Sequence, residues 1–332
     1  ISIPDSITIQ PFYAMQGVQN YLVSANHPLY KAEDGVLLSK NGKTLVAFPS
    51  GRVQGQYEIP SAIDTVHQYA LYTNNIVSIK VPKTVKAIQE NAFGNCTYIL
   101  FEAETPTAYV EKSAFNSSTA LLVSDTVSYK REWSAYKKQF RLIKDAIRNV
   151  TITAKSSESD LYNAITDRKP ANEYMLSEVL DLTITGSINS YDLLLLRNKM
   201  INLRVLDIEN VDVVENSYQY YTGLSTENNT LKEHSFRNLL SIKLPKSLTS
   251  ITNALQDCGS LRYVEFNNPH IGVGNIYAYA DCNVVLNEGV ESVAQKAFQN
   301  TDVQSVSLPS TLRSVSAYAF DGCDELRTIE MA

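Results

Sequence analysis

The sequence has few of the residues from which metal sites and nucleophilic active sites are built. Its 332 residues include four cysteines, four histidines and one tryptophan. Phosphate-binding glycine loops and the G-x-S-x-G nucleophile elbow are missing as well. None of the histidines has a second ligand at the spacing of a zinc motif; they are His27, His67, His234 and His270. We therefore expect no metal, no cofactor and no enzymatic activity.

The chain also lacks a positive surplus and any long apolar run. Lysine and arginine total 29 against 35 aspartate and glutamate residues, which gives a formal net charge of −6. A chain with this balance has no basic excess to neutralise phosphates, so nucleic acid is not an expected partner. No stretch approaches the ~18 consecutive apolar residues of a membrane span, so we expect no membrane insertion within this chain.

What the sequence does contain is a repeated pair, alanine followed by an aromatic residue or leucine. Ala70, Ala92 and Ala114 begin three copies that are 22 residues apart. The copies that recur at 19–24 residues within each half are Ala70-Leu71, Ala92-Phe93, Ala114-Phe115, Ala254-Leu255, Ala278-Tyr279, Ala297-Phe298 and Ala319-Phe320, and Ala14-Met15 is an earlier copy. Such a period is typical of solenoids, in which no single repeat can bury its apolar face alone. We predict an α/β solenoid with short parallel strands and coils of about 22–24 residues.

Ahead of several of these pairs the chain alternates between apolar and polar residues, as a half-buried strand does. Examples are Ser78-Ile79-Lys80-Val81, Ser241-Ile242-Lys243-Leu244 and Ser305-Val306-Ser307-Leu308. Because side chains alternate across a strand, the isoleucine, valine and leucine residues face the core. The outward positions form our candidate binding surface: Lys80, Lys243, Tyr263, Glu265 and Ser307. We interpret the outward carboxylates as a solvated face and not as a catalytic pair.

The four cysteines fall at one position of the repeat, four residues after the alanine. They are Cys96, Cys258, Cys282 and Cys323. Strands of neighbouring coils lie ~4.8 Å apart, a marginal separation for a disulfide. We expect four buried thiols, and a Cys258–Cys282 bridge remains the alternative.

The repeat is interrupted in the middle of the chain, which predicts two consecutive repeat units, 1–145 and 146–332. The first carries a hairpin insert at about 16–58, because Asn41-Gly42 between alternating apolar residues is a strong hairpin signal. The second begins with an N-terminal cap at about 146–180. No cap follows its last strand, so we expect this unit to be truncated at its C-terminus.

Two further segments depart from the coil pattern. Aromatic and apolar residues at helical spacing predict a C-terminal cap helix for the first unit at about 124–145; they are Tyr129, Trp133, Tyr136, Phe140 and Ile143. The polar stretch 215–230 is rich in tyrosine and holds Tyr218, Tyr220 and Tyr221. Tyrosine is common at protein interfaces and also stacks on sugars, so these three join the candidate binding surface. Packing within the protein is the alternative for most tyrosines.

Several of these motifs together resemble the BspA-like leucine-rich-repeat family of bacterial surface proteins. The resemblance rests on the apolar-Pro…A-F-x-x-C pattern at 81–96 and 308–323, on the segment D-G-V-L-x-S-K-x-G-K-T-L-V-x-F-P at 34–49, and on the leucine-rich segment 182–208. It implies an exported or surface-anchored protein that takes part in adhesion to host matrix proteins or neighbouring cells. It assigns no binding residue.

We therefore expect a non-enzymatic protein, extracellular or at the cell surface, that binds a protein partner on host matrix or another cell. The strand face of the solenoid is the expected contact surface. The alternative is a carbohydrate-binding module that holds a glycan on exposed tyrosines.

Overall fold

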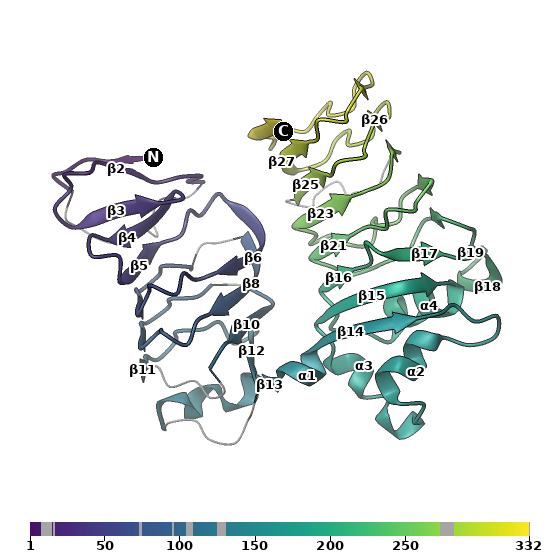
Figure 1. The fold of residues 1–332 in the computed structure, drawn as a ribbon, viewed down its shortest axis with the longest axis horizontal. Helices are drawn as coiled ribbons and strands as arrows, with labels where there is room; N and C mark the ends of the chain where they lie inside the picture. Colours follow the sequence, from purple (N-terminus) through teal and green to yellow (C-terminus); the bar gives the residue numbers. More distant parts are fainter. Residues whose placement is uncertain are drawn as a thin grey trace. The chain divides into compact units, whose positions relative to one another are not determined.

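A computed structural model describes residues 1–7, 15, 17–72, 75–94, 96–103, 109–124, 131–272 and 282–331. The chain forms two compact units, Ile1–Lys144 and Asp145–Ala332. Figure 1 shows stacked strands in each unit, and apart from the antiparallel hairpins within 30–47 and 216–226 the paired strands that the structure describes are parallel. The predicted leucine-rich-repeat solenoid with short parallel strands is confirmed.

The first unit has a five-stranded parallel sheet along one side. Its strands are β6 (Val53–Glu58), β8 (Asn75–Val81), β10 (Tyr98–Phe101), β12 (Ala120–Val123) and β13 (Phe140–Leu142). Equivalent core positions stand in register across all five strands as Tyr57, Ile79, Ile99, Leu121 and Phe140. Every member of this row is buried. The alternation in the sequence is thus converted into continuous apolar rows through the stack.

A second sheet of the first unit combines coil strands with the predicted insert. The two-residue strands β7 (Thr65–Val66), β9 (Ala87–Ile88) and β11 (Tyr109–Val110) pair in parallel, and β3 (Tyr30–Glu33), β4 (Val36–Ser39) and β5 (Thr44–Ala47) extend them. The β4–β5 hairpin turns at Asn41-Gly42. Glycine suits this turn because Gly42 has a φ of 70°. Val53–Glu58 lies in the predicted insert but forms a coil strand. At the start of the chain, β1 (Ser2–Ile3) pairs with β2 (Leu22–Val23).

The end of the first unit differs from the predicted cap helix. A 3₁₀ helix covers Arg131–Gln139, and the chain then returns to an extended strand, so Phe140 belongs to β13. The helical prediction is therefore wrong from Phe140 to Leu142, where pairing with β12 takes over. Trp133 is fully buried, as expected. Tyr129 lies outside the described residues. A short helix α1 (Ile143–Ala146) follows.

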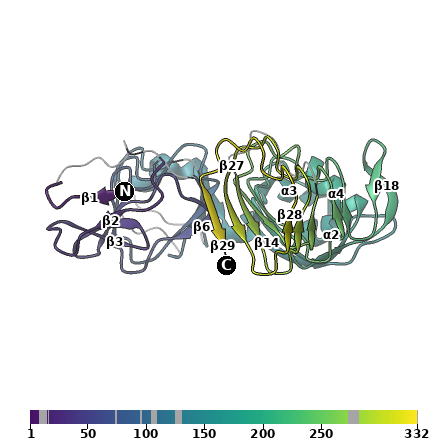
Figure 2. The same ribbon diagram turned by 90° about the horizontal axis from the view of Figure 1, so that it is seen from above.

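The second unit is built on a sheet of nine parallel strands. Along the stack these are β14 (Ile147–Ile152), β15 (Asp181–Ile188), β16 (Val205–Asp207), β21 (Ser241–Lys243), β23 (Tyr263–Phe266), β25 (Cys282–Leu286), β27 (Val303–Leu308) and β29 (Thr328–Met331), with β17 (Val211–Val213) beside β15. Figure 2 looks along this stack, so the coils appear one behind another. Two-residue strands form the opposite side: β20 (Thr230–Leu231), β22 (Ser250–Ile251), β24 (His270–Ile271), β26 (Ser292–Val293) and β28 (Ser314–Val315).

Helices gather at the start of the second unit. They are α2 (Asp160–Thr166), a 3₁₀ turn at Pro170–Asn172, α3 (Met175–Glu178) and α4 (Ser190–Asn198). Helix α4 begins with a capping box, in which the Asn189 side chain accepts from Tyr191 N and the Asp192 carboxylate accepts from Asn189 N at 3.1 Å. The same carboxylate accepts from Leu161 N at 3.2 Å, which ties α2 to α4.

The repeated phenylalanines of successive coils stack on one another within each unit. Phe93 and Phe115 stack with ring centroids 5.2 Å apart, and Phe298 and Phe320 also stack at 5.2 Å. No disulfide links the four cysteines, all of which the structure describes. Cys282, however, lies inside β25, so it does not share the loop position of Cys96 and Cys323.

Candidate functional site

The outer face of the nine-stranded sheet brings four of the predicted surface residues together. One outward row consists of Asp207, Lys243, Glu265, Val285, Ser307 and Glu330, in register on six successive strands. The neighbouring row consists of Val205, Ser241, Tyr263, Asn283, Ser305 and Thr328. Lys243, Tyr263, Glu265 and Ser307 are therefore close neighbours on one face. We call these two rows the sheet face.

Side-chain hydrogen bonds within and between strands fix much of the sheet face. The Tyr263 hydroxyl donates to Glu265 Oε1 at 2.7 Å, and Ser305 donates to Asn283 Oδ1 at 2.5 Å. Asn287 Nδ2 donates to the second oxygen of Glu265 at 3.0 Å. Burial, followed by the hydrogen bond to Glu265, raises the pKa of Tyr263, so this phenol stays protonated. The face is consequently a rigid, polar surface and not a set of mobile side chains.

Lys243 is less tightly held than Lys80, its counterpart in the first unit. Lys80 contacts Glu58 at 3.0 Å and Glu102 at 2.9 Å. Lys243 Nζ lies 3.7 Å from Asp207 and 3.8 Å from Glu265, beyond hydrogen-bonding distance. Its side chain is 40% exposed, against 28% for Lys80. Lys243 can therefore take up a new acceptor at low cost, whereas Lys80 would have to leave two carboxylates.

The tyrosine-rich stretch forms an antiparallel hairpin of β18 (Asn216–Tyr221) and β19 (Leu224–Thr226), seen at the side of the second unit in Figure 2. Tyr218 and Tyr221 are exposed. Tyr220 is only 2% exposed, and its hydroxyl donates to the Glu233 carbonyl at 2.9 Å. Its assignment to the binding surface is wrong, because the ring packs into the core and fastens the hairpin to the following coil.

Both exposed tyrosines use one ring face within the protein. Tyr218 stacks on Tyr191 with centroids 4.1 Å apart, and Tyr221 stacks on His234 at the same distance. The guanidinium of Arg197 lies 4.8 Å from the Tyr221 centroid and also contacts Asp257 at 2.7 Å. These contacts hold the hairpin against the rest of the second unit, and only the remaining exposed surface of the two rings is open to a partner.

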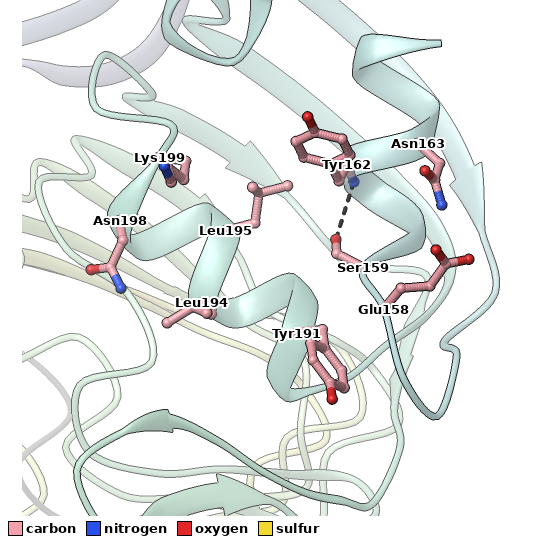
Figure 3. A pocket seen from close by; sticks show the side chains of 9 residues that line it. All are labelled: Glu158, Ser159, Tyr162, Asn163, Tyr191, Leu194, Leu195, Asn198 and Lys199. Carbon is pink, nitrogen blue, oxygen red and sulfur yellow. Dashed lines mark hydrogen bonds between the residues drawn. The ribbon is translucent and has the colours of Figure 1, made fainter. Parts of the chain in front are cut away.

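A cavity of about 370 Å³ lies between α2 and α4 in the second unit. Figure 3 shows Tyr162 and Tyr191 at two sides of it, with Leu194 and Leu195 along α4. Ser159 Oγ, which caps α2, accepts from Tyr162 N at 3.1 Å and donates to Asp192 at 2.7 Å. The wall is largely apolar, and no periodicity in the sequence indicates it, since the two helices come from different coils.

The charged groups at the rim of this cavity already have partners. Glu158 pairs with Lys155 at 3.1 Å, and Lys199 pairs with Glu173 at 2.9 Å. Behind the wall, burial raises the pKa of Asp192, whose oxygens accept three hydrogen bonds. The cavity can therefore hold an uncharged, partly apolar group. The Asp192 carboxylate holds α2 and α4 together through these hydrogen bonds and does not indicate acid–base chemistry.

Within the described ranges no group of three or more histidine, cysteine or acidic side chains could hold a metal ion. The His234 ring contacts Asp257 at 2.8 Å, the combination nearest to a catalytic pair. Sequence spacing missed this contact because the two residues lie 23 positions apart on neighbouring coils. Among the residues that the structure describes, no helix is long and apolar enough to cross a membrane.

Solved structures of several bacterial proteins align with the chain, among them the three that follow. A leucine-rich cell surface protein from Faecalibacterium prausnitzii is 15% identical over 93% of this chain and 96% of its own, with a TM-score of 0.28. A leucine-rich repeat protein from Eubacterium ventriosum is 16% identical over 98% of this chain and 52% of its own, with a TM-score of 0.24. The pneumococcal vaccine antigen PcpA is 14% identical over 91% and 84%, with a TM-score of 0.26. At such low TM-scores these likenesses carry no argument about this chain.

Comparison of the sequence with protein families is decisive. The search of curated proteins gave no match. The BspA type leucine-rich repeat region, in contrast, matches six copies over residues 47–154 and 215–327, more than half of the chain. The matched residues include the coils that carry the phenylalanine rows of both units. The chain belongs to the BspA type leucine-rich repeat family.

Proposed function

We propose that this protein is a non-enzymatic interaction protein of the cell surface or extracellular space, and that the sheet face binds a protein partner on host matrix or another cell. Membership of the BspA type repeat family supports the surface role. The observation that carries the proposal is the pair of outward rows that run in register over six strands.

The size and rigidity of the sheet face suit a protein partner. Six strands at ~4.8 Å spacing extend over roughly 24 Å, a length comparable with one side of a standard protein interface. The backbone is fixed by the sheet, and Glu265 is held by both Tyr263 and Asn287. A surface ordered before contact loses little conformational entropy on binding.

Lys243 indicates the chemistry of the partner. Its ammonium has two carboxylates nearby but no short contact with either. A carboxylate of the partner that approached Lys243 would complete the hydrogen bonding of its ammonium group. The partner is therefore expected to present an acidic side chain, surrounded by groups that hydrogen-bond to Ser307 and Asn283.

The test is saturable binding of the full chain to host matrix and bacterial surface proteins, measured by biolayer interferometry. Lys243→Glu should weaken binding at least about tenfold, because it replaces an attraction by a repulsion within the contact. Ser307→Arg should weaken it similarly by steric obstruction. The matched control is Lys199→Glu, which reverses an exposed lysine on the helical side and should leave the affinity unchanged.

The opposite pattern would reject the sheet face as the binding site. Binding that survives both Lys243→Glu and Ser307→Arg, but is lost with Lys199→Glu or with Tyr218→Ala, would transfer the contact to the helices and the hairpin. Circular dichroism of each variant verifies that the coils remain folded.

A further inference from the structure

A second cavity, of about 440 Å³, lies entirely within the first unit. Its lining comes from the β3–β4 turn, from β4, from the loop before β6 and from β6 itself: Glu33, Asp34, Val36, Leu38, Arg52, Gln56, Tyr57, Glu58 and Pro60. Its volume is in the ~300–1,000 Å³ range of small-molecule sites. Polar groups converge here from segments that are distant in the sequence.

Arg52 is fixed over the β3–β4 turn. Its Nη2 donates to the Asp34 carbonyl at 2.7 Å and to Asn20 Oδ1 at 2.5 Å. The approach requires glycine in the turn, because a Cβ on Gly35 would lie 2.7 Å from Arg52 Nη2. Gly35 also has a φ of 70°, which other residues rarely adopt. Both hydrogen bonds use one nitrogen of the guanidinium, which leaves Nε and Nη1 uncommitted by them.

Tyr57 supplies the observation that points to a ligand. The residue is 8% exposed, and its ring packs on Phe48 with centroids 4.5 Å apart. Its buried hydroxyl has no hydrogen-bond partner among the residues that the structure describes. Burial raises the pKa of this phenol, so it is protonated at neutral pH and can donate as well as accept. A buried hydroxyl without a partner is unfavourable, and a ligand in the cavity would supply one after a small displacement of the Tyr57 ring, because the oxygen itself is closed to solvent in this structure.

The charges of the lining select the kind of ligand. Glu33 pairs with Lys31, and Glu58 pairs with Lys80, so two of the three carboxylates are partly neutralised but keep oxygens that can accept. An anion would meet these carboxylates, and a cation would meet Arg52. A neutral ligand with several hydroxyls avoids both conflicts, since each hydroxyl can donate to a carboxylate and accept from the guanidinium.

We propose that this cavity binds a neutral saccharide. Carboxylate oxygens of Asp34 and Glu58 accept from its hydroxyls, and Arg52 and Tyr57 donate to them. Val36, Leu38 and Pro60 form an apolar wall for the C–H face of the sugar ring. The site is separate from the sheet face, so it stands or falls independently of the proposed protein contact.

The experiment is titration calorimetry of the full chain with glucose, galactose, mannose and N-acetylglucosamine. At least one sugar should bind saturably, and Tyr57→Phe should lower its affinity by about tenfold or more. Because the hydroxyl makes no hydrogen bond within the described protein, the same variant should keep or raise the melting temperature. Loss of binding without loss of stability is a result that a purely structural tyrosine would not give.

Two further variants make the result unambiguous. Glu58→Gln, on the exposed rim, should also weaken sugar binding. Tyr263→Phe removes a hydroxyl from the second unit and should leave the affinity for the sugar unchanged. The proposal is overturned if none of the four sugars binds, or if Tyr57→Phe binds the sugar as tightly as the native chain. Preferential binding of lysine methyl ester or inorganic phosphate would overturn it equally, because either would assign the cavity to a charged ligand.

Discussion

Phe115 in the first unit and Phe320 in the second occupy the same position of the repeat but are covered differently. Phe115 is 5% exposed, with Phe93 stacked on it and Trp133 and Tyr136 at 5.7 and 5.1 Å. Phe320 stacks on Phe298 but is only partly buried. The burial of a repeat side chain is thus set by its neighbours on both sides and not by its own coil.

The last strands of the two sheets repeat this contrast. In the first unit β13 carries Phe140, which is 9% exposed and packs against Trp133 at 5.9 Å. In the second unit β29 continues the register row of Val306 with Ile329, yet Ile329 is 56% exposed and Met331 is 82% exposed. The same strand pattern therefore yields core in one place and open surface in the other.

The largest expected effect tests this difference directly. Phe115→Ala should destabilise the first unit by about 3–5 kcal/mol, because it leaves a cavity among three aromatic rings. Phe320→Ala should cost roughly half as much, since part of that ring is already in contact with water. Trp133 is the only tryptophan, so its fluorescence during urea unfolding reports the first unit, and circular dichroism reports both.

A matched surface change provides the baseline for these measurements. Tyr174→Ala removes a ring that is 65% exposed and should shift stability by less than about 0.5 kcal/mol. Equal losses for Phe115→Ala and Phe320→Ala would contradict the idea that neighbouring coils and the cap determine how much each phenylalanine stabilises.

Thiol reactivity should follow the same contrast with a smaller effect. Cys96 and Cys323 hold the same loop position, but Cys96 is buried and Cys323 is partly exposed. Burial raises the pKa of Cys258 to about 12, so that thiol should be inert at neutral pH. Alkylation of the native chain, followed by mass spectrometry, should modify Cys323 roughly tenfold faster than Cys96 or Cys258. Faster modification of Cys96 would show that the first unit opens more readily than its packing implies.

Repetition explains why so much of the fold could be predicted. The alternation around Lys80, Lys243 and Ser307 occurs in several coils, so one local pattern fixed many strands at once. The phenylalanine rows followed from the same logic. The cap was harder, because the aromatic spacing that predicts a helix up to Phe140 is also compatible with a 3₁₀ helix that ends before a strand.

The candidate sites were less predictable because they depend on contacts between coils. Tyr220 looks the same in the sequence as its exposed neighbours, but its ring packs into the core of the second unit and its hydroxyl donates to the Glu233 carbonyl of the following coil. The cavity of the first unit joins Arg52 to Asp34, 18 positions earlier, through a glycine turn. No spacing rule links such residues. The outward positions of the sheet face, in contrast, recur once per coil, so the alternation in the sequence predicts them.

The smallest expected effect compares the two lysines of the outer sheets. A hydrogen bond from Lys80 holds the pKa of Glu102 below its ordinary value. Lys80→Met should therefore raise the pKa of Glu102, as followed by carboxyl NMR titration. A carboxylate with a lowered pKa favours folding above its unfolded pKa and loses that contribution as the pH falls, so Lys80→Met should also flatten the acid dependence of stability slightly. Lys243→Met is the control and should leave the pKa of Glu102 unchanged. If Lys80→Met also left the pKa of Glu102 unchanged, Lys80 would be as loosely held as Lys243.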